Sequence, residues 1–314
     1  MNKKKLNIIS PVYNESENLN NFYNKIKISI NKLQTNYDIN LILVDDGSKD
    51  NSGTIIQKLS NEDKIVKGIY FTKNFGHQNA ILAGLKEFDA DLYLVIDSDL
   101  QHNPELIELM LDNMMKTNSE IIQMKKSYTD YEFFLKRIFS KFFYLLFSKL
   151  TNINIEPGSS DFFLISEKVR SRLLDSKISH SFVRGFLHWT GFKKMSIDFT
   201  PSKRKSGKSN YSFLKLLEFA LTGFYFYTSK LYMFIFIFSF LIMFGCLIFV
   251  IYIITSYLTG SLIENTGWST TTILILFFGS LSLLLNSVLL FILNKIFDYS
   301  SNKPFYIKKE NKDK

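Results

Sequence analysis

Cysteine is almost absent from this 314-residue chain, which contains only Cys246, inside an apolar run. A single cysteine excludes a disulfide framework and a metal site built from cysteine thiolates, and it is compatible with a reducing compartment. A signal peptide is not expected either, because the apolar run in the N-terminal MNKKKLNIISPVYNE is only a strand's length and Pro11 interrupts it. The formal net charge of +9 suits nucleic acid, an anionic membrane or phosphorylated substrates, and composition alone does not choose among them.

Charged side chains are missing from two long stretches in the C-terminal third. Leu231–Tyr257 and Thr270–Leu293 contain none. Each stretch exceeds the roughly 20 apolar residues that cross a hydrocarbon core. The pattern predicts a hairpin of two transmembrane helices within residues 230–296. A pair of buried core helices is the alternative, which the lack of a charged face disfavours.

Lysine and arginine are absent from the connector between these stretches, LTGSLIENTGWS, which holds Glu264. The cations lie outside the hairpin instead, at Lys230, Lys295, Lys303, Lys308 and Lys309. The positive-inside rule therefore places both chain ends in the cytoplasm. We expect a multi-pass protein of the inner (cytoplasmic) membrane, with a cytoplasmic N-terminal domain and a basic cytoplasmic tail over residues 297–314.

Two further segments mix cations with large apolar side chains. Glu132–Leu150 interleaves four lysines and arginines with phenylalanine and leucine, and Tyr211–Thr228 is aromatic with one lysine and one glutamate. Helices of this basic and aromatic kind lie at the headgroup interface. We expect interfacial helices at about residues 132–150 and 211–229, with ordinary core-facing helices as the alternative.

The N-terminal half alternates short apolar runs with helical patterns. Strands are expected at Leu6–Ser10, Asn40–Val44, Val66–Phe71 and Tyr93–Ile96, and helices at Glu17–Leu33, Ser52–Ser60, Gln78–Lys86 and Pro104–Lys116. This alternation predicts an α/β fold with a mostly parallel sheet and helices on both faces. Ligands of such sheets bind at the carboxyl ends of the strands.

Unusual residues, most of them polar, follow each expected strand. They are Pro11, Tyr13, Asn14 and Glu15 after the first, Asp45 and Asp46 after the second, Lys73 and Asn74 after the third, and Asp97 and Asp99 after the fourth. Two aspartates on one turn repel each other unless a cation or a proton lies between them. Oxygen ligands select Mg²⁺ or Mn²⁺, which commonly bridges carboxylates to substrate phosphates. The fourth strand end is therefore a predicted metal and diphosphate site, although Asp-x-Asp alone would more often be a solvated turn.

Five motifs, in this order along the chain, are similar to those of a known family: PVYNESENL, LILVDDGSKDNS, KNFGHQNAILAGL, VIDSDLQHNPE and RKSGKSNYSF. Followed by two apolar runs, they resemble the family 2 glycosyltransferases of the GT-A fold. The most similar group is the membrane-anchored polyprenyl-phosphate glycosyltransferases, which include dolichol-phosphate mannose synthases and bacterial enzymes that load undecaprenyl phosphate with glucose or a related sugar. The resemblance covers nearly the whole chain and implies a GT-A domain, with a Rossmann-like sheet, over residues 1–210.

The resemblance implies a role for each matching residue. Nucleotide-sugar binding falls to Pro11, Tyr13, Asn14, Glu15, Asp46, Lys73, His77, Gln78 and Asp97; metal binding to Asp97, Asp99 and Gln101; acceptor or phosphate binding to Lys126, Arg184, Arg204 and Lys208; and catalysis to Asp99 and Asp161. A plain turn at Asp46, a structural His77 and a solvated linker around Arg204 are the alternatives. Because a lipid phosphate is already ionised near neutral pH, a general base is needed less than usual. The expected role of Asp161 is therefore to orient groups or balance charge, with a general base as the alternative.

The sequence departs from the family pattern directly after Asp161. Phe163 stands where the family usually has an arginine, which leaves the affinity for the acceptor and its identity open. Lys126 occupies a position where relatives often carry arginine, and Arg184 keeps the family's residue. Arginine binds phosphate through two nitrogens whereas lysine acts as a point charge, so geometric control at Lys126 would be weaker.

The expected activity is inverting transfer of a sugar from a UDP-hexose, such as UDP-glucose, to a polyprenyl phosphate such as undecaprenyl phosphate, with Mg²⁺ or Mn²⁺. A GDP-mannose-dependent enzyme and a catalytically impaired nucleotide-binding scaffold are the alternatives. A processive polysaccharide synthase is disfavoured because no Gln-x-x-Arg-Trp motif occurs, and a nucleic-acid binder because no binding motif does. The expected partners are the nucleotide sugar, the lipid, the membrane, a second copy of the chain and a membrane flippase.

Overall fold

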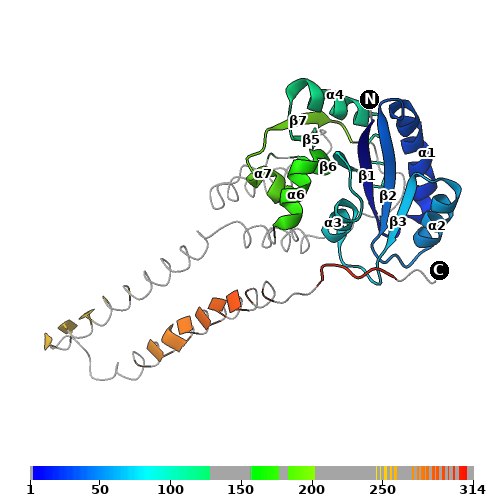
Figure 1. Ribbon diagram of the computed structural model, residues 1–314. Helices are drawn as coiled ribbons and strands as arrows, with labels where there is room; N and C mark the ends of the chain where they lie inside the picture. Colours follow the sequence, from blue (N-terminus) through cyan, green and yellow to red (C-terminus); the bar gives the residue numbers. More distant parts are fainter. Residues whose placement is uncertain are drawn as a thin grey trace. The chain divides into compact units, whose positions relative to one another are not determined.

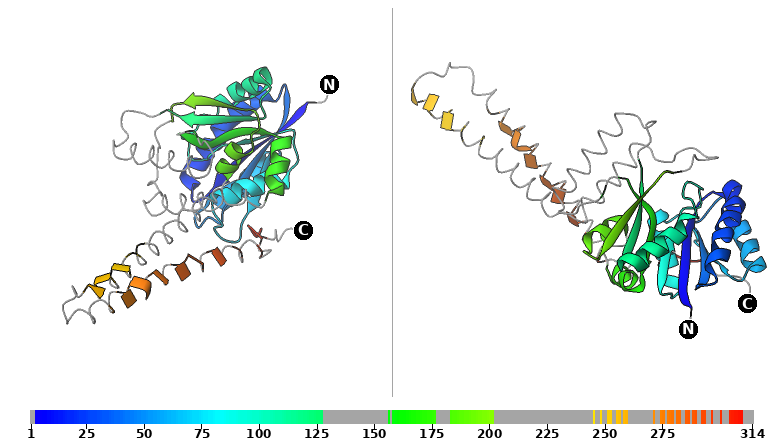
Figure 2. Two further views of the ribbon diagram at one scale, coloured as in Figure 1. Left: turned by 90° about the vertical axis from the view of Figure 1, so that its left-hand side faces the viewer. Right: turned by 90° about the horizontal axis from the view of Figure 1, so that it is seen from above.

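The computed structural model describes residues 3–127, 156, 158–176, 183–201 and 304–309, with single positions between 245 and 300 (Figures 1 and 2). The chain divides into two compact units. The first consists of Met1–Tyr227 together with Pro304–Lys314, and the second of Thr228–Lys303.

In the described part of the first unit, seven strands form one sheet in the order β3-β2-β1-β4-β6-β5-β7. They are β1 (Lys4–Val12), β2 (Tyr37–Asp45), β3 (Val66–Tyr70), β4 (Leu92–Val95), β5 (Ile121–Lys126), β6 (Ser159–Ser166) and β7 (Lys194–Phe199). The pairs β1–β2, β2–β3, β1–β4 and β5–β7 are parallel, whereas β6 runs antiparallel to both of its neighbours. The sheet is thus mostly parallel, as predicted, but β6 makes it mixed.

The described helices of this unit cover both faces of the sheet (Figure 1). They are α1 (Ser16–Leu33), α2 (Ser52–Glu62), α3 (His77–Glu87), α4 (Leu106–Thr117), α6 (Glu167–Asp175) and α7 (Val183–Trp189). Buried residues of α1, α2 and α4 share one apolar cluster with the sheet, and those of α3, α6 and α7 share the other. The first four strands and helices lie where the sequence pattern predicted them.

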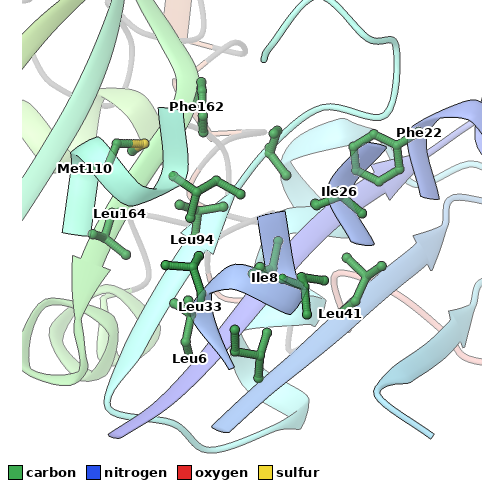
Figure 3. Close-up of a cluster of buried hydrophobic side chains, with 14 of the residues drawn as sticks. Leu6, Ile8, Phe22, Ile26, Leu33, Leu41, Leu94, Met110, Phe162 and Leu164 are labelled. Atoms are coloured by element: carbon green, nitrogen blue, oxygen red, sulfur yellow. The ribbon is translucent and has the colours of Figure 1, made fainter. Parts of the chain in front are cut away.

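Alternation of side chains along the strands supplies both clusters. On β1, Leu6 and Ile8 are fully buried in the cluster that also holds Phe22 and Ile26 of α1 (Figure 3). Ile9 points to the opposite face and belongs to the cluster with α3. There Gly84 lets the helix approach closely, since a Cβ at this position would lie 2.3 Å from Cγ2 of Ile9.

Several predicted segments lie outside the described residues. These are the interfacial helices at 132–150 and 211–229, the segment that holds Arg204 and Lys208, and most of both predicted spans. The positions that are described within Leu231–Tyr257 and Thr270–Leu293 are helical. Among the described residues, no helix is both long enough and apolar enough to cross a membrane.

Candidate active site

The carboxyl ends of β1, β2, β3 and β4 meet at one edge of the sheet. Their parallel registers pair Val12 with Asp45, Asp45 with Tyr70, and Ile9 with Val95, so the loops that follow all leave on the same side. The predicted clustering of polar residues at this edge is therefore confirmed. In open α/β sheets this is the edge where ligands bind.

Asp46 anchors the loop that follows β3. The residue is 3% exposed, and its carboxylate accepts hydrogen bonds from the N–H groups of Phe75 (2.7 Å) and Gly76 (3.0 Å). Burial raises the pKa of Asp46 to about 6, although both backbone donors act to lower it. The side chain predicted to bind the nucleotide therefore also fixes the backbone that begins α3.

Gly47 allows the same loop to pack against the end of β2. Its φ is +67°, and a Cβ would lie 2.2 Å from the carbonyl carbon of Lys73. A residue with a side chain fits neither the backbone conformation nor the space. The side chain of Lys73 itself is exposed, with Nζ 5.1 Å from the centre of the Phe75 ring.

Asn14 and Glu15 join the loop after β1 to the start of α2. Asn14 has a φ of +55°, donates its N–H to Oγ of Ser48 (3.0 Å) and accepts the N–H of Lys49 at Oδ1 (2.8 Å). The Glu15 N–H donates to Oγ of Ser52 (3.0 Å). These two predicted nucleotide-binding residues thus shape the loops at this edge. Tyr13 lies beside them, partly buried.

The turn after β4 carries both aspartates of the predicted metal site. Ser98 ties it to β1 by donating to the carbonyl of Pro11 (3.0 Å), and Asp99 accepts the N–H of Gln101 (3.0 Å). Leu100 has a φ of +63°, an uncommon value for a residue with a side chain. The strained turn places Asp97 and Asp99 directly after the end of β4.

Asp97 has the character of a cation ligand. Among the described residues nothing donates a hydrogen bond to its buried Oδ1, and burial together with Asp99 and Asp161 raises the pKa of Asp97 to about 6. A buried carboxylate oxygen that accepts no hydrogen bond, with a second carboxylate close enough to raise its pKa, fits Mg²⁺ or Mn²⁺, and Nε2 of His77 lies 3.4 Å from it. In the residues that the structure describes, no group of three or more His, Cys, Asp or Glu side chains is arranged to hold a metal. Asp97 and Asp99 would hold such a cation, and substrate phosphate is a common further ligand of Mg²⁺.

Gln101, the third predicted metal ligand, contacts a lysine side chain. Its Oε1 lies 3.4 Å from Nζ of Lys126 at the end of β5. Lys126 is thus brought next to the aspartate turn, as its predicted role in phosphate binding requires.

His102 belongs to the site although neither the sequence pattern nor the resemblance gives it a role. Its ring is 1% exposed, stacks on Phe162 at 5.0 Å, and accepts the Asp97 N–H at Nδ1 (3.3 Å). Burial lowers the pKa of His102 to about 3, so the ring is neutral and its approach to the Asp97 carboxylate is no ion pair. The ring supports the turn from the protein interior. In the sequence DSDLQH, Gln101 and His102 indicate a polar loop, and the local pattern does not predict that His102 is buried.

Asp161 on β6 is the centre of a second group of polar side chains, next to the one around Asp97. Arg184 of α7 contacts it through Nε (3.2 Å) and Nη2 (3.0 Å), and Nε2 of His77 lies 3.7 Å away. Burial alone would raise its pKa, but Arg184 and then His77 hold the pKa of Asp161 below its ordinary value. An ionised, well-partnered carboxylate suits a group that orients its neighbours better than a base.

At the start of α3, His77 and Gln78 connect the polar groups around Asp97 and Asp161. His77 Nε2 lies 3.4 Å from Asp97 Oδ1 as well as near Asp161. Gln78 donates to Asp161 (3.4 Å) and accepts the N–H of Val183 (3.1 Å), which joins α3 to α7. Phe163, at the family's arginine position, is fully buried in the apolar cluster that also holds residues of α3, α6 and α7.

The comparisons with known proteins agree with this geometry. The family model for glycosyl transferase family 2 matches residues 7–174, more than half of the chain. The uncharacterized glycosyltransferase YkcC of Bacillus subtilis is 32% identical over 317 residues, which cover 96% of this chain and 92% of YkcC. The chain belongs to glycosyltransferase family 2. Within the family, the bactoprenol glucosyl transferase of Shigella phage SfV is 29% identical, and the match covers 99% of this chain and 100% of that protein.

A solved structure supports the fold of this family 2 member. Mannosyl-3-phosphoglycerate synthase from Rubrobacter xylanophilus superposes with a TM-score of 0.50 at 12% identity, over 70% of this chain and 71% of that one. The predicted GT-A fold, with its mixed α/β sheet, and the predicted glycosyltransferase activity are thus confirmed.

Proposed function

We propose that the protein is a membrane-anchored, inverting glycosyltransferase that moves glucose from UDP-glucose to a polyprenyl phosphate such as undecaprenyl phosphate. The observation that carries the proposal is the match, from end to end, to relatives named bactoprenol glucosyl transferase. The site agrees with it, because paired carboxylates, a buried ion pair and nearby cations lie at one sheet edge.

The donor side of the site consists of the Asp46-anchored loop and the aspartate turn. The loop and the end of β1 would hold the nucleoside, and Asp97 and Asp99, with Gln101 nearby, would hold Mg²⁺ or Mn²⁺. The cation would neutralise the diphosphate as it leaves. Hydrogen bonds from Ser98 and to His102 keep the turn in place, so the two carboxylates are positioned before the donor arrives.

The acceptor side consists of cations around Asp161. Arg184 is held by Asp161, and Lys126 by Gln101, so both are placed for a phosphate before it binds. Arg204 and Lys208 are further candidates from the sequence. The lipid phosphate oxygen attacks the anomeric carbon from the side opposite the diphosphate. The lipid phosphate is already ionised, so Asp161 orients Arg184 and His77 and removes no proton.

The membrane supplies the lipid acceptor. The two charge-free runs, the helical backbone at their described positions and the many exposed apolar side chains there support two transmembrane helices. The proposed topology places both chain ends and the catalytic domain on the cytoplasmic side of the inner membrane. A second copy of the chain and a flippase for the product are proposed partners.

The test is a transfer assay with isolated membranes. Membranes with and without the protein are incubated with labelled UDP-glucose, other UDP-sugars or GDP-mannose, plus undecaprenyl phosphate, and the lipids are extracted. The proposal predicts a labelled lipid from UDP-glucose that depends on the protein. Labelled lipid from GDP-mannose alone would indicate the mannosyltransferase alternative, and nucleotide binding without any transfer would indicate an impaired scaffold.

A further inference from the structure

The C-terminal segment Pro304–Lys309 extends the catalytic sheet at its edge. β3 is the outermost strand, and the segment forms an antiparallel bridge between Lys308 and Phe71, directly after β3. The Thr72 N–H donates to the Ile307 carbonyl (3.0 Å), and the Lys309 N–H donates to the Tyr70 carbonyl (2.8 Å). Figure 1 shows this red segment passing the end of β3. Addition of a short strand satisfies backbone groups that an open edge leaves unpaired.

An aromatic chain leads from this segment to the donor side of the site. The Tyr306 ring stacks on Phe71 at 4.9 Å and 15°, and Phe71 meets Phe75 edge to face at 5.7 Å. Phe71 is fully buried. Phe75 donates its backbone N–H to Asp46 at 2.7 Å. Tyr306 is therefore separated from the Asp46 carboxylate by two aromatic residues in direct contact.

The segment also holds the far end of α3. Glu87, the last residue of this helix, accepts a hydrogen bond from the Tyr306 hydroxyl (2.7 Å) and one from Nζ of Lys308 (2.8 Å). Burial and then Glu87 raise the pKa of Tyr306, so the hydroxyl remains a donor. The helix begins at His77, which lies between Asp97 and Asp161. The segment thus contacts the start of the loop that precedes α3 and the C-terminal end of α3, and this loop and helix border the site.

We propose that residues 304–309 are a positioning element of the donor site, with Tyr306 as its principal side chain. By fixing Thr72–Gly76 against β3 and α3, the segment sets the affinity for the nucleoside diphosphate part of the donor. The inference rests on the proposed function for the identity of the ligand, whereas the ordering of the loop does not depend on it.

Two matched pairs of variants of the full-length, purified protein test the proposal. Tyr306→Ala removes the ring, and Tyr306→Phe keeps the stack on Phe71 but loses the hydroxyl. Lys309→Pro removes the N–H that donates to Tyr70, and Lys309→Ala keeps it. The measurements are hydrogen exchange of the 72–76 backbone, affinity for UDP with Mg²⁺, and the KM and kcat for the nucleotide sugar.

Tyr306→Ala and Lys309→Pro should speed exchange at 72–76 and weaken UDP binding by about 2- to 30-fold. The KM for the donor should rise by a similar factor while kcat stays largely unchanged. Lys309→Ala should resemble the wild type, and Tyr306→Phe, which keeps the stack on Phe71 but loses the hydrogen bond to Glu87, should lie between the wild type and Tyr306→Ala. Unchanged exchange overturns the inference, and so does faster exchange with unchanged UDP affinity. Wild-type protein that binds neither UDP nor GDP would contradict the proposed function, and the exchange data would then still decide whether the segment orders the loop.

Discussion

Arg184 and Asp161 contact each other through two nitrogen–oxygen pairs, at 3.2 and 3.0 Å, with side chains that are 20% and 9% exposed. Removing one partner of a buried pair leaves an uncompensated charge. We predict that Arg184→Ala lowers the free energy of unfolding by about 3 kcal/mol. The measurement is denaturant unfolding in detergent.

A double-mutant cycle with Asp161→Asn provides the control. The loss of unfolding free energy in the double variant should be smaller than the sum of the losses in the two single variants. The reason is that Asp161→Asn removes the carboxylate charge that Arg184→Ala leaves without its partner. Additive losses would contradict a direct interaction between the two side chains.

Gly47 should tolerate no side chain. Gly47→Ala combines a positive φ with a Cβ that meets the Lys73 carbonyl carbon at 2.2 Å, so the loop that Asp46 anchors must move. We predict a loss of stability of at least about 1–2 kcal/mol from the backbone conformation alone, together with weaker UDP binding. Gly191→Ala is the matched control, because Gly191 has a φ of +68° with open space around it. Equal effects of the two variants on UDP binding would refute the contact.

The stability that Glu87 confers should depend on pH. Burial alone would raise its pKa, but hydrogen bonds from Lys308 and Tyr306, and the charges of Lys308 and Lys86, hold the pKa of Glu87 below its ordinary value. The interaction therefore stabilises the fold above the unfolded-state pKa of about 4.3, and the stabilisation is lost as pH falls through the lower, folded-state pKa.

Glu87→Gln tests this pH dependence. We predict that the variant is less stable than the wild type by about 0.5–1 kcal/mol at pH 7, the range for a partly exposed pair. The difference should shrink toward zero below about pH 4. Unfolding curves at several pH values measure it, and a difference that is constant across pH would show that the charge of Glu87 plays no part.

The proposed topology can be tested by labelling. In a Cys246→Ser background, a cysteine at Ser261 should react with an impermeant thiol reagent in intact cells, because the connector lies outside. A cysteine at Ser301 should react only after permeabilisation. The reverse pattern would overturn the proposed orientation.

The first four strands and helices could be predicted because continuous apolar runs alternate with helical patterns there. β5, β6 and β7 were not predicted. In IIQMKK and KMSIDF short apolar runs mix with polar residues, and no local signal reveals that SSDFFLIS runs antiparallel between β4 and β5. Pairing between distant segments is a tertiary property, which the sequence of one strand does not contain.

The candidate site was predictable where polar residues follow apolar strands, as at Asp46 and Asp97. It was not predictable where burial decides the role. His102 looks like a loop residue, yet it is buried and neutral. Tyr306 lies 219 residues from Glu87 in the sequence, and its contacts there and with Phe71 have no local signature.

The most direct test of the account is glucose transfer by Asp99→Asn. The variant keeps the size of the side chain and removes one charge from the aspartate turn. Asp89→Asn is the matched control, because that side chain is 91% exposed and lies on the loop before β4, at the other end of the strand. With UDP-glucose, undecaprenyl phosphate and Mg²⁺ or Mn²⁺, the account predicts that Asp99→Asn loses at least about 10²-fold in kcat, comparable to losing one preorganised charge-stabilising group. Asp89→Asn should retain wild-type activity, and near wild-type turnover in Asp99→Asn would contradict the account.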